Sequence, residues 1–276
     1  VPGIAKTLIV RTLAKVTGGT YSRVQFTADL LPTDITGLTI YEAKKGFTVM
    51  KGPIFANYII AAEVNRSPPK VQSALLEAMQ EKQVTIGKTT YPLPLPFFVM
   101  ATQNPIESAG VYNLPEAQID RFLFKINIYY PSADEEIEIL SKNITLYSFD
   151  DYNIKSVINP KVIHEIQQFV KEIYVSKPIE KDVTRIVDAT RNPSKYNIKL
   201  GKYIEWGSSP RASIGLYIAS KAEALLRGQS FVIPHHVKTV AHDVLRHRIL
   251  LNYEGQAENI SRDDIISEIL NKVPMP

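Results

Sequence analysis

The sequence predicts an α/β domain with a mostly parallel sheet, followed by a small all-helical domain. A continuous apolar run at 58–62 has the length of a strand that is buried on both faces. A second such run lies at 97–102, beyond a helical segment, which is the order of a parallel sheet. After residue 160 the apolar residues recur at helical spacing instead. We place the domains at 1–147 and 148–276, with a polar link from 147 to 159.

Composition is that of a globular protein and excludes several classes. The 276 residues are 45% hydrophobic and 22% charged, which supports a sizeable core. Cysteine is absent, so disulfides and thiolate metal sites are excluded. We see no signal peptide and no apolar run of the roughly 18 residues that a membrane span needs, and expect a cytoplasmic protein without a membrane span. The net charge of +4 permits nucleic-acid contact, but solvated lysines explain it better and no such partner is expected.

The chain opens with VPGIAKT, which matches the end of the phosphate loop G-x-x-x-x-G-K-[ST]. Ala5 stands where the last glycine usually is, and the first glycine would precede Val1, so the loop is truncated. Either the sequence is a fragment of a longer product or its sheet lacks a strand. Helical spacing at 8–16 places Lys6 and Thr7 at a helix N-terminus, which favours a phosphate. Lys6 would contact phosphates and Thr7 would bind Mg²⁺, unless this is a chance pattern at the start of an ordinary helix.

A strand at 22–27 and a hairpin at 38–52 are expected next. The first alternates polar and apolar residues, and the second has apolar stretches on both sides of Lys44-Lys45-Gly46. The hairpin either contacts a neighbour or client protein or is a plain surface hairpin.

Glu63 directly follows the buried strand at 58–62. Ser67 offers a helix N-cap, and Pro68 and Pro69 suit the first turn of the helix that follows. An α/β ATPase presents its catalytic acid in this way, at the end of a buried strand. The alternative is an exposed glutamate on an ordinary turn.

A second hairpin is expected at 83–91, and Asn104 follows the buried strand at 97–102. Its carboxamide can position a water against a γ-phosphate, or it simply starts the turn before Pro105. A short helix at 114–122 ends in Asp120 and Arg121. An alternating strand at 123–130 and a helix to about 141, opened by a capping box of Ser132 and Glu135, come next.

The second domain is expected to be helical throughout. Asn159, Ser208 and Ser261 are suitable caps and Gly228 a suitable stop. Arg211 lies in the first turn of a helix, where the dipole disfavours a cation, so it either faces an anion or is a solvated surface residue. The histidines form no i, i+4 pair, so no histidine metal site is expected. The predicted helices lie near 160–173, 178–191, 209–227, 234–249 and 261–273.

In this order the motifs resemble the MoxR family of AAA+ ATPases. They are VPGIAKT, RVQFTADLLPTDITG, GPIFANYIIAAEVNRSPPKVQSALLEAMQE, FFVMATQNPIE, LPEAQIDRF and SPRAS, and the resemblance covers nearly the whole chain. It implies an AAA+ module, which is a P-loop NTPase domain with a helical lid, with ATP and Mg²⁺ as cofactors and ADP as product. Such proteins are chaperone-like and form rings, usually hexamers. They remodel or activate partner proteins, often ones with a von Willebrand factor A domain.

The resemblance also implies roles for individual residues. Glu63 matches the Walker B glutamate that activates water, and Asn104 matches the first sensor. Arg121 matches the arginine finger, which acts in a neighbouring subunit's site, and Arg211 matches the second sensor. The hairpins at 38–52 and 83–91 resemble two insertions of the family. The residues that match the Walker A loop and its flank are Pro2, Gly3, Ile4, Ala5, Lys6, Thr7 and Leu8.

One position departs from the family pattern. The Walker B motif ends Asp-Glu in the family, and its Asp holds Mg²⁺, but this chain has Ala62-Glu63. Losing that carboxylate removes a charge that helps to order the metal. Two expectations follow: an ATP-hydrolysing remodelling protein, or a nucleotide-binding or structural module with impaired or no hydrolysis.

Overall fold

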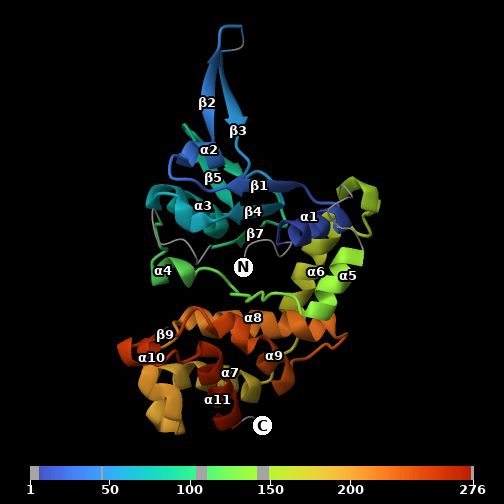
Figure 1. The fold of residues 1–276 in the computed structure, drawn as a ribbon. Coiled ribbons are helices and arrows are strands. Elements are labelled where there is room, and N and C mark those ends of the chain that lie inside the picture. Colours follow the sequence, from blue (N-terminus) through green and yellow to red (C-terminus); the bar gives the residue numbers. More distant parts are fainter. Residues whose placement is uncertain (1–5, 45, 104–110, 142–148, 275–276) are drawn as a thin grey trace. The chain divides into compact units, whose positions relative to one another are not determined.

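The computed structural model describes residues 6–44, 46–103, 111–141 and 149–274, in two compact units (Figure 1). The first unit contains Val1–Leu114 and Ile128–Glu165, and the second contains Pro115–Asn127 and Ile166–Pro276. This division differs from the predicted boundary at 147/148, because 115–127 belongs to the second unit. Helix α6 (Pro160–Glu172) crosses the division. The predicted site residues Pro2–Ala5 and Asn104 lie outside the described residues.

A parallel sheet forms the centre of the first unit, as predicted. Its order is β1 (Tyr21–Gln25), β4 (Tyr58–Ala62) and β7 (Phe98–Ala101), and both pairs are parallel. All five residues of β4 are buried, as expected for the middle strand of a covered sheet.

Helix α1 (Lys6–Val16) covers one face of this sheet. Its Val10 and Ala14 pack in one apolar cluster with Tyr58, Ile60 and Ala62 of β4. These three strand residues alternate along β4 and therefore point to the same face. The predicted helix at 8–16 is thus confirmed and fixed to the central strand.

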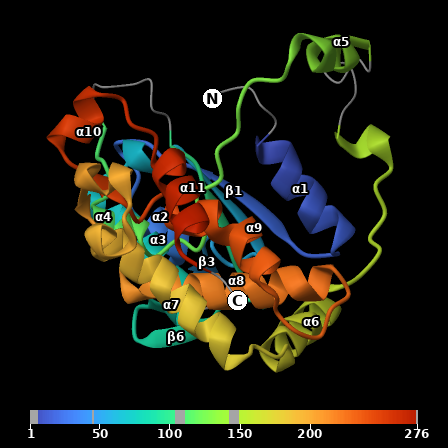
Figure 2. The same ribbon diagram turned by 90° about the horizontal axis from the view of Figure 1, so that it is seen from below.

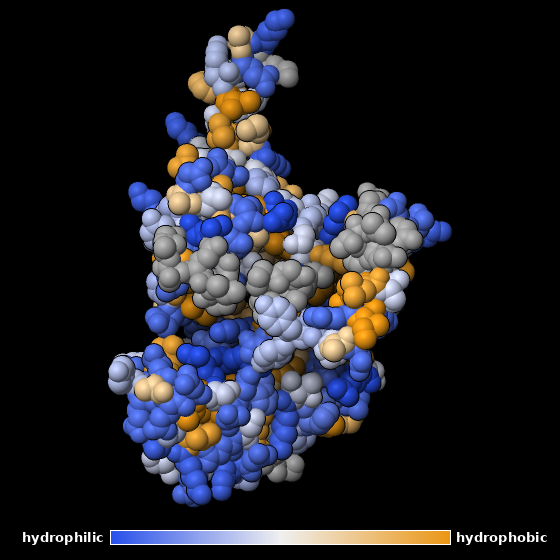
Figure 3. All heavy atoms as spheres, viewed as in Figure 1, coloured by the Kyte–Doolittle hydropathy of each residue, from blue (hydrophilic) through white to orange (hydrophobic). Residues whose placement is uncertain are grey.

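Both predicted hairpins of the first unit are present. Strands β2 (Gly37–Glu42) and β3 (Gly46–Lys51) follow α2 (Pro32–Thr36), and β5 (Gln83–Ile86) and β6 (Thr89–Pro92) follow α3 (Pro69–Glu81). The β2–β3 hairpin projects from its unit (Figure 1), and apolar side chains are visible along it (Figure 3). Its exposed Tyr41 and Phe47 lie opposite each other, with ring centroids 5.3 Å apart.

The second unit is mainly helical, as predicted, and Figure 2 shows its helices from below. Apolar side chains of its helices share one buried core. A two-stranded sheet of β8 (Ile204–Trp206) and β9 (Leu250–Leu251) was not predicted, and its strands are too short for a periodic signal. The helices are α7 (Lys177–Arg191), α8 (Pro210–Leu226), α9 (Pro234–Leu245), α10 (Tyr253–Ala257) and α11 (Arg262–Lys272).

Two expectations about the segment 114–130 are wrong. Its helix, α4 (Glu116–Ile119), is shorter than 114–122, and residues 123–130 form no strand. A strand needs a neighbour for its ladder, and alternation alone does not supply one. The backbone of this segment is bonded to the second unit instead, since Lys125 N donates to Asp243 O at 2.8 Å.

Two predicted caps are also wrong, and the others are confirmed. Ser209, and not Ser208, caps α8, since its Oγ accepts from Arg211 N. Ser67 does not cap α3, because its hydroxyl donates to Val64 O at 3.2 Å. Confirmed are the caps at Asn159 and Ser261, the stop at Gly228 and the box of Ser132 and Glu135 that opens α5 (Ala133–Ser141).

No helix in the described ranges is long and apolar enough to cross a membrane.

Candidate functional site

The N-terminus of α1 lies toward the carboxyl end of β4. The other end of the helix is fixed at the start of the strand, where Thr17 Oγ1 donates to Tyr58 Oη at 2.8 Å and Tyr58 N donates to Thr20 O at 3.0 Å. Eleven helical residues and five strand residues both span about 16 Å. Lys6 and Thr7 therefore lie at the edge of the sheet where β4 ends. The backbone N–H groups in the first turn of a helix and the helix dipole suit a phosphate.

Glu63 leaves β4 at that edge in a left-handed conformation, with φ 56° and ψ 50°. Its N–H donates to Thr102 Oγ1 at 3.0 Å, and the next N–H, of Val64, donates to Thr102 O at 2.9 Å. Thr102 thus joins the ends of β4 and β7. A left-handed non-glycine residue needs such support, because the conformation is sparsely populated.

The Glu63 carboxylate is partly exposed and paired. Its side chain is 31% exposed, and Oε2 lies 3.0 Å from Nη1 of Arg66. A carboxylate that is open to water and paired with a cation is held in one direction. Those properties suit a group that orients an attacking water.

The turn after Glu63 is held by a buried amide. Gln72 Nε2 lies 3.2 Å from Val64 O, 3.0 Å from Ser67 O and 2.9 Å from Tyr112 O. Sequence reasoning missed Gln72 and Thr102, because their partners are distant or depend on the local turn. Arg66 was also missed, although its spacing of three from Glu63 was a usable signal.

Ala62 offers no ligand at this edge. It is 8% exposed and packs in the apolar cluster beneath α1. Among the described residues, no group of three or more histidines or carboxylates could hold a metal ion. Thr7 is exposed at the start of α1, and a threonine hydroxyl is a suitable Mg²⁺ ligand beside a phosphate.

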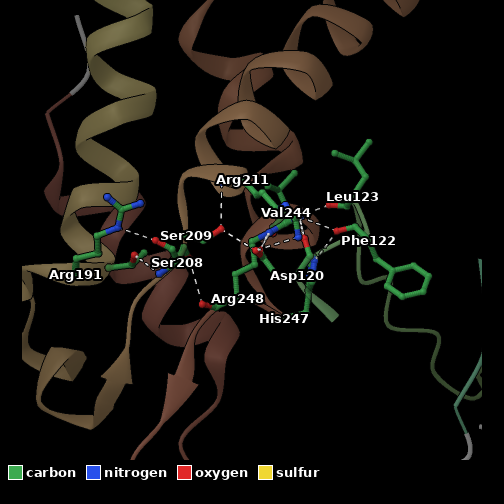
Figure 4. A network of polar contacts seen from close by, with 11 residues as sticks. Asp120, Phe122, Leu123, Arg191, Ser208, Ser209, Arg211, Val244, His247 and Arg248 are labelled. Carbon is green, nitrogen blue, oxygen red and sulfur yellow. Dashed lines mark hydrogen bonds and ion pairs between the residues drawn. The ribbon is translucent and has the colours of Figure 1, made fainter. Parts of the chain in front are cut away.

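A separate set of charged residues surrounds Asp120 in the second unit (Figure 4). Arg248 donates through Nε to Asp120 Oδ1 at 2.8 Å. The same carboxylate accepts a bond from Ser209 Oγ at 2.8 Å and lies 3.9 Å from Arg211 Nη1. Arg211 therefore faces an anion, which is one of the two alternatives drawn from its place on the helix. Its side chain is still 43% exposed.

Arg121, the next residue, is exposed. No hydrogen bond or ion pair of its side chain occurs within the described part of the chain. Its backbone is fixed, since Arg121 N donates to Gln118 O at 3.2 Å. The main chain at Arg121 is therefore fixed within the second unit, while its guanidinium is exposed and able to bind another group.

His247 also binds this segment. Its Nε2 lies 2.9 Å from Phe122 O, and burial, followed by the charge of Arg248, lowers the His247 pKa to about 4. The imidazole is therefore neutral near pH 7, and because a carbonyl only accepts, Nε2 carries the proton. No sequence pattern indicates this bond, which joins residues 125 positions apart.

The chain is similar to known proteins along its whole length. Residues 1–124 match the family model "ATPase family associated with various cellular activities (AAA)", and 201–269 match the AAA lid domain. The whole chain is 47% identical to Chaperone MoxR1 of Mycobacterium tuberculosis, covering 73% of it, and 43% identical to YeaC of Bacillus subtilis, covering 83%. A solved structure from Cytophaga hutchinsonii, described as a candidate ATPase, superposes with a TM-score of 0.92 at 48% identity. That match covers 100% of this chain and 84% of the other.

Proposed function

Because the chain belongs to the MoxR family of AAA+ ATPases, we propose that it hydrolyses ATP to remodel or activate partner proteins. We further propose that it works in the cytoplasm as a ring, a hexamer in the family's usual form, with clients that carry a von Willebrand factor A domain. The observation that carries the proposal is the juxtaposition of Glu63 with the N-terminus of α1 at one sheet edge.

The residues divide the work as follows. Lys6 and the N–H groups at the start of α1 bind phosphates, and Thr7 contributes an oxygen to Mg²⁺, which neutralises phosphate charge. Glu63 orients the attacking water and accepts its proton. Asn104, outside the described residues, is assigned to the same water, and Arg211 to the phosphates, on the family pattern alone.

Arg121 completes the site of a neighbouring subunit in this proposal. Its exposure and its lack of partners within the described ranges support a role outside its own chain. An arginine that reaches a neighbour's phosphates stabilises transition-state charge there.

Mixing two inactive variants tests this division between subunits. Glu63→Gln and Arg121→Ala should each lower ATP turnover at least about 100-fold, with nucleotide affinity kept. In a one-to-one mixture about a quarter of the sites combine an intact Glu63 with a neighbour's intact Arg121, so turnover should recover to about that fraction. Full activity of Arg121→Ala alone, or no recovery in a co-assembled mixture, would contradict the proposal.

The second candidate function is nucleotide binding without turnover. Ala62 favours it, because a buried methyl group stands where the family has a metal-ordering carboxylate. In that case the assembly would respond to ATP binding alone, and Glu63→Gln would change nothing.

A further inference from the structure

Residues 120–123 are not held by regular secondary structure. Helix α4 ends at Ile119, and 123–130 pairs with no strand in the described residues. Yet Arg121 must be presented at a defined place if it acts on a neighbour, because about 1 Å of misplacement can lower a rate about 100-fold. Something other than a helix or a sheet has to fix this backbone.

One buried arginine makes several of the contacts to this backbone. Besides the ion pair with Asp120, Arg248 Nη2 donates to Asp120 O at 3.0 Å and to Phe122 O at 2.6 Å, and Nη1 donates to Leu123 O at 3.1 Å. Nη1 also contacts Val244 O, which ties the guanidinium to α9 (Figure 4). The bonded carbonyls lie on both sides of Arg121.

The placement of Arg248 explains why it is an arginine. The residue follows the end of α9 at Leu245, and its side chain is only 3% exposed. Burying a charge is unfavourable unless geometry and partners compensate, and packed apolar side chains often do as well for stability. What an apolar residue cannot do is bond several carbonyls at once, which needs the planar, five-donor guanidinium.

We propose that Arg248 is a positioning residue for Arg121, fixing residues 120–123 on the second unit so that Arg121 is held in place for a neighbouring site. The inference rests on the proposed role of Arg121. Asp120 is the matching anchor, since its carboxylate and its carbonyl both bind Arg248.

Steady-state kinetics of the full chain separate positioning from mere stabilisation. Arg248→Lys keeps the positive charge but loses the planar guanidinium that bonds several carbonyls at once. We therefore expect kcat to fall at least about tenfold, while the ATP Kd stays within about twofold. The double variant with Arg121→Ala should be no slower than Arg121→Ala alone, because a misplaced arginine and a missing one are equivalent. The matched control is Arg262→Lys, whose guanidinium also bonds a carbonyl of the second unit, Ile249 O at 3.0 Å, but none in 120–123.

Mixing experiments assign the defect to the donated residue. Glu63→Gln chains should rescue Arg248→Lys chains, since they supply a correctly held Arg121. Chains with both Glu63→Gln and Arg248→Lys should fail to rescue Arg121→Ala. Equal rescue by both donors, or a further loss in the double variant with Arg121→Ala, would overturn the inference.

Folding and the underlying function are controlled separately. Folding of Arg248→Lys is judged by the fluorescence of the single tryptophan, Trp206, which lies in the second unit. If that variant does not fold, Asp120→Asn replaces it. Chains with both Glu63→Gln and Asp120→Asn should then also fail to rescue Arg121→Ala. A normal donor with Asp120→Asn would then overturn the inference. Wild-type turnover in Arg121→Ala would instead refute the role of Arg121 itself, and the inference with it.

Discussion

Ala62 and Glu63 are neighbours in the chain with opposite surroundings. Ala62 is buried against α1, while Glu63 turns outward in a left-handed conformation supported by Thr102. The contrast arises because β4 ends at Ala62, and the left-handed backbone of Glu63 turns its side chain out of the strand. A carboxylate at 62 would therefore lie on the face that α1 covers, near the residues assigned to the phosphates and Mg²⁺.

Restoring that carboxylate should raise turnover and lower stability. We expect Ala62→Asp to increase Mg²⁺-dependent ATP hydrolysis about tenfold or more, because a carboxylate orders the metal. Without metal it should destabilise the protein by about 1–3 kcal/mol, since the group enters an apolar cluster. Hydrolysis and urea unfolding measure the two effects. The matched control, Ala62→Asn, should lose stability without gaining rate, and an unchanged rate in folded Ala62→Asp would contradict a metal role for this position.

Motifs that are local in the sequence could be read before the structure was known. Lys6, Thr7 and Glu63 stand out because a helix start and a strand end have short signatures. Thr102 and Arg248 do not, because their partners Glu63 and Asp120 lie 39 and 128 positions away. A pairing between distant residues depends on the tertiary fold, which a single sequence does not encode in any short pattern.

The β2–β3 hairpin depends on a glycine at its base. Gly37 has φ +99°, and a Cβ there would lie 2.3 Å from Met50 O and 2.6 Å from Gly52 N. Backbone atoms cannot move aside as a flexible side chain can. Gly46, at the turn, also has positive φ but open space around it.

The two glycines should therefore respond differently to alanine. We expect Gly46→Ala to lower the free energy of unfolding by about 1 kcal/mol, from backbone strain alone, and Gly37→Ala by at least about 2–4 kcal/mol, from strain plus overlap. Urea unfolding followed by far-UV circular dichroism compares them. Equal losses would show that the base of the hairpin does not have the close contacts described.

His247 should make the stability of the second unit depend on pH. Its pKa is about 4 in the folded chain and about 6.5 when unfolded, so the unfolded state binds more protons between these values. Stability is complete above about pH 6.5 and falls by up to about 3 kcal/mol as pH drops through 4. His247→Gln, which can still donate to Phe122 O, should have a shallower slope. Unfolding followed by Trp206 fluorescence tests this, and identical slopes would contradict it.

At the scale of elements, periodicity predicted most helices and strands correctly, but it did not predict which segments are held by tertiary contacts instead. The strands at 58–62 and 97–102 and the helices after 160 follow from their spacing, and the structure contains them. The strand at 123–130 does not form, although its residues alternate. The helix predicted at 234–249 is also too long, because α9 ends at Leu245. Residues 246–248 bind 120–125 instead of continuing the helix.

At the scale of the whole molecule, the chain does not divide at one point. Composition changes near 147, but residues 115–127 already belong to the second unit. Arg121 therefore belongs to the unit that also carries Arg211, whereas Glu63 belongs to the first unit. The membership predicted from the motifs is confirmed by the comparisons, whereas ring assembly and client remodelling are our proposals.

The central claim is that this chain hydrolyses ATP through Glu63 in an assembly. The most direct measurement is Mg²⁺-dependent ATP hydrolysis by the purified chain over a range of protein concentrations, with Glu63→Gln as control. We predict a rate per subunit that rises with concentration, because each site needs a neighbour's Arg121, and that vanishes in the control. A rate no higher than the control, in protein shown to be folded, would contradict the claim and favour nucleotide binding without turnover.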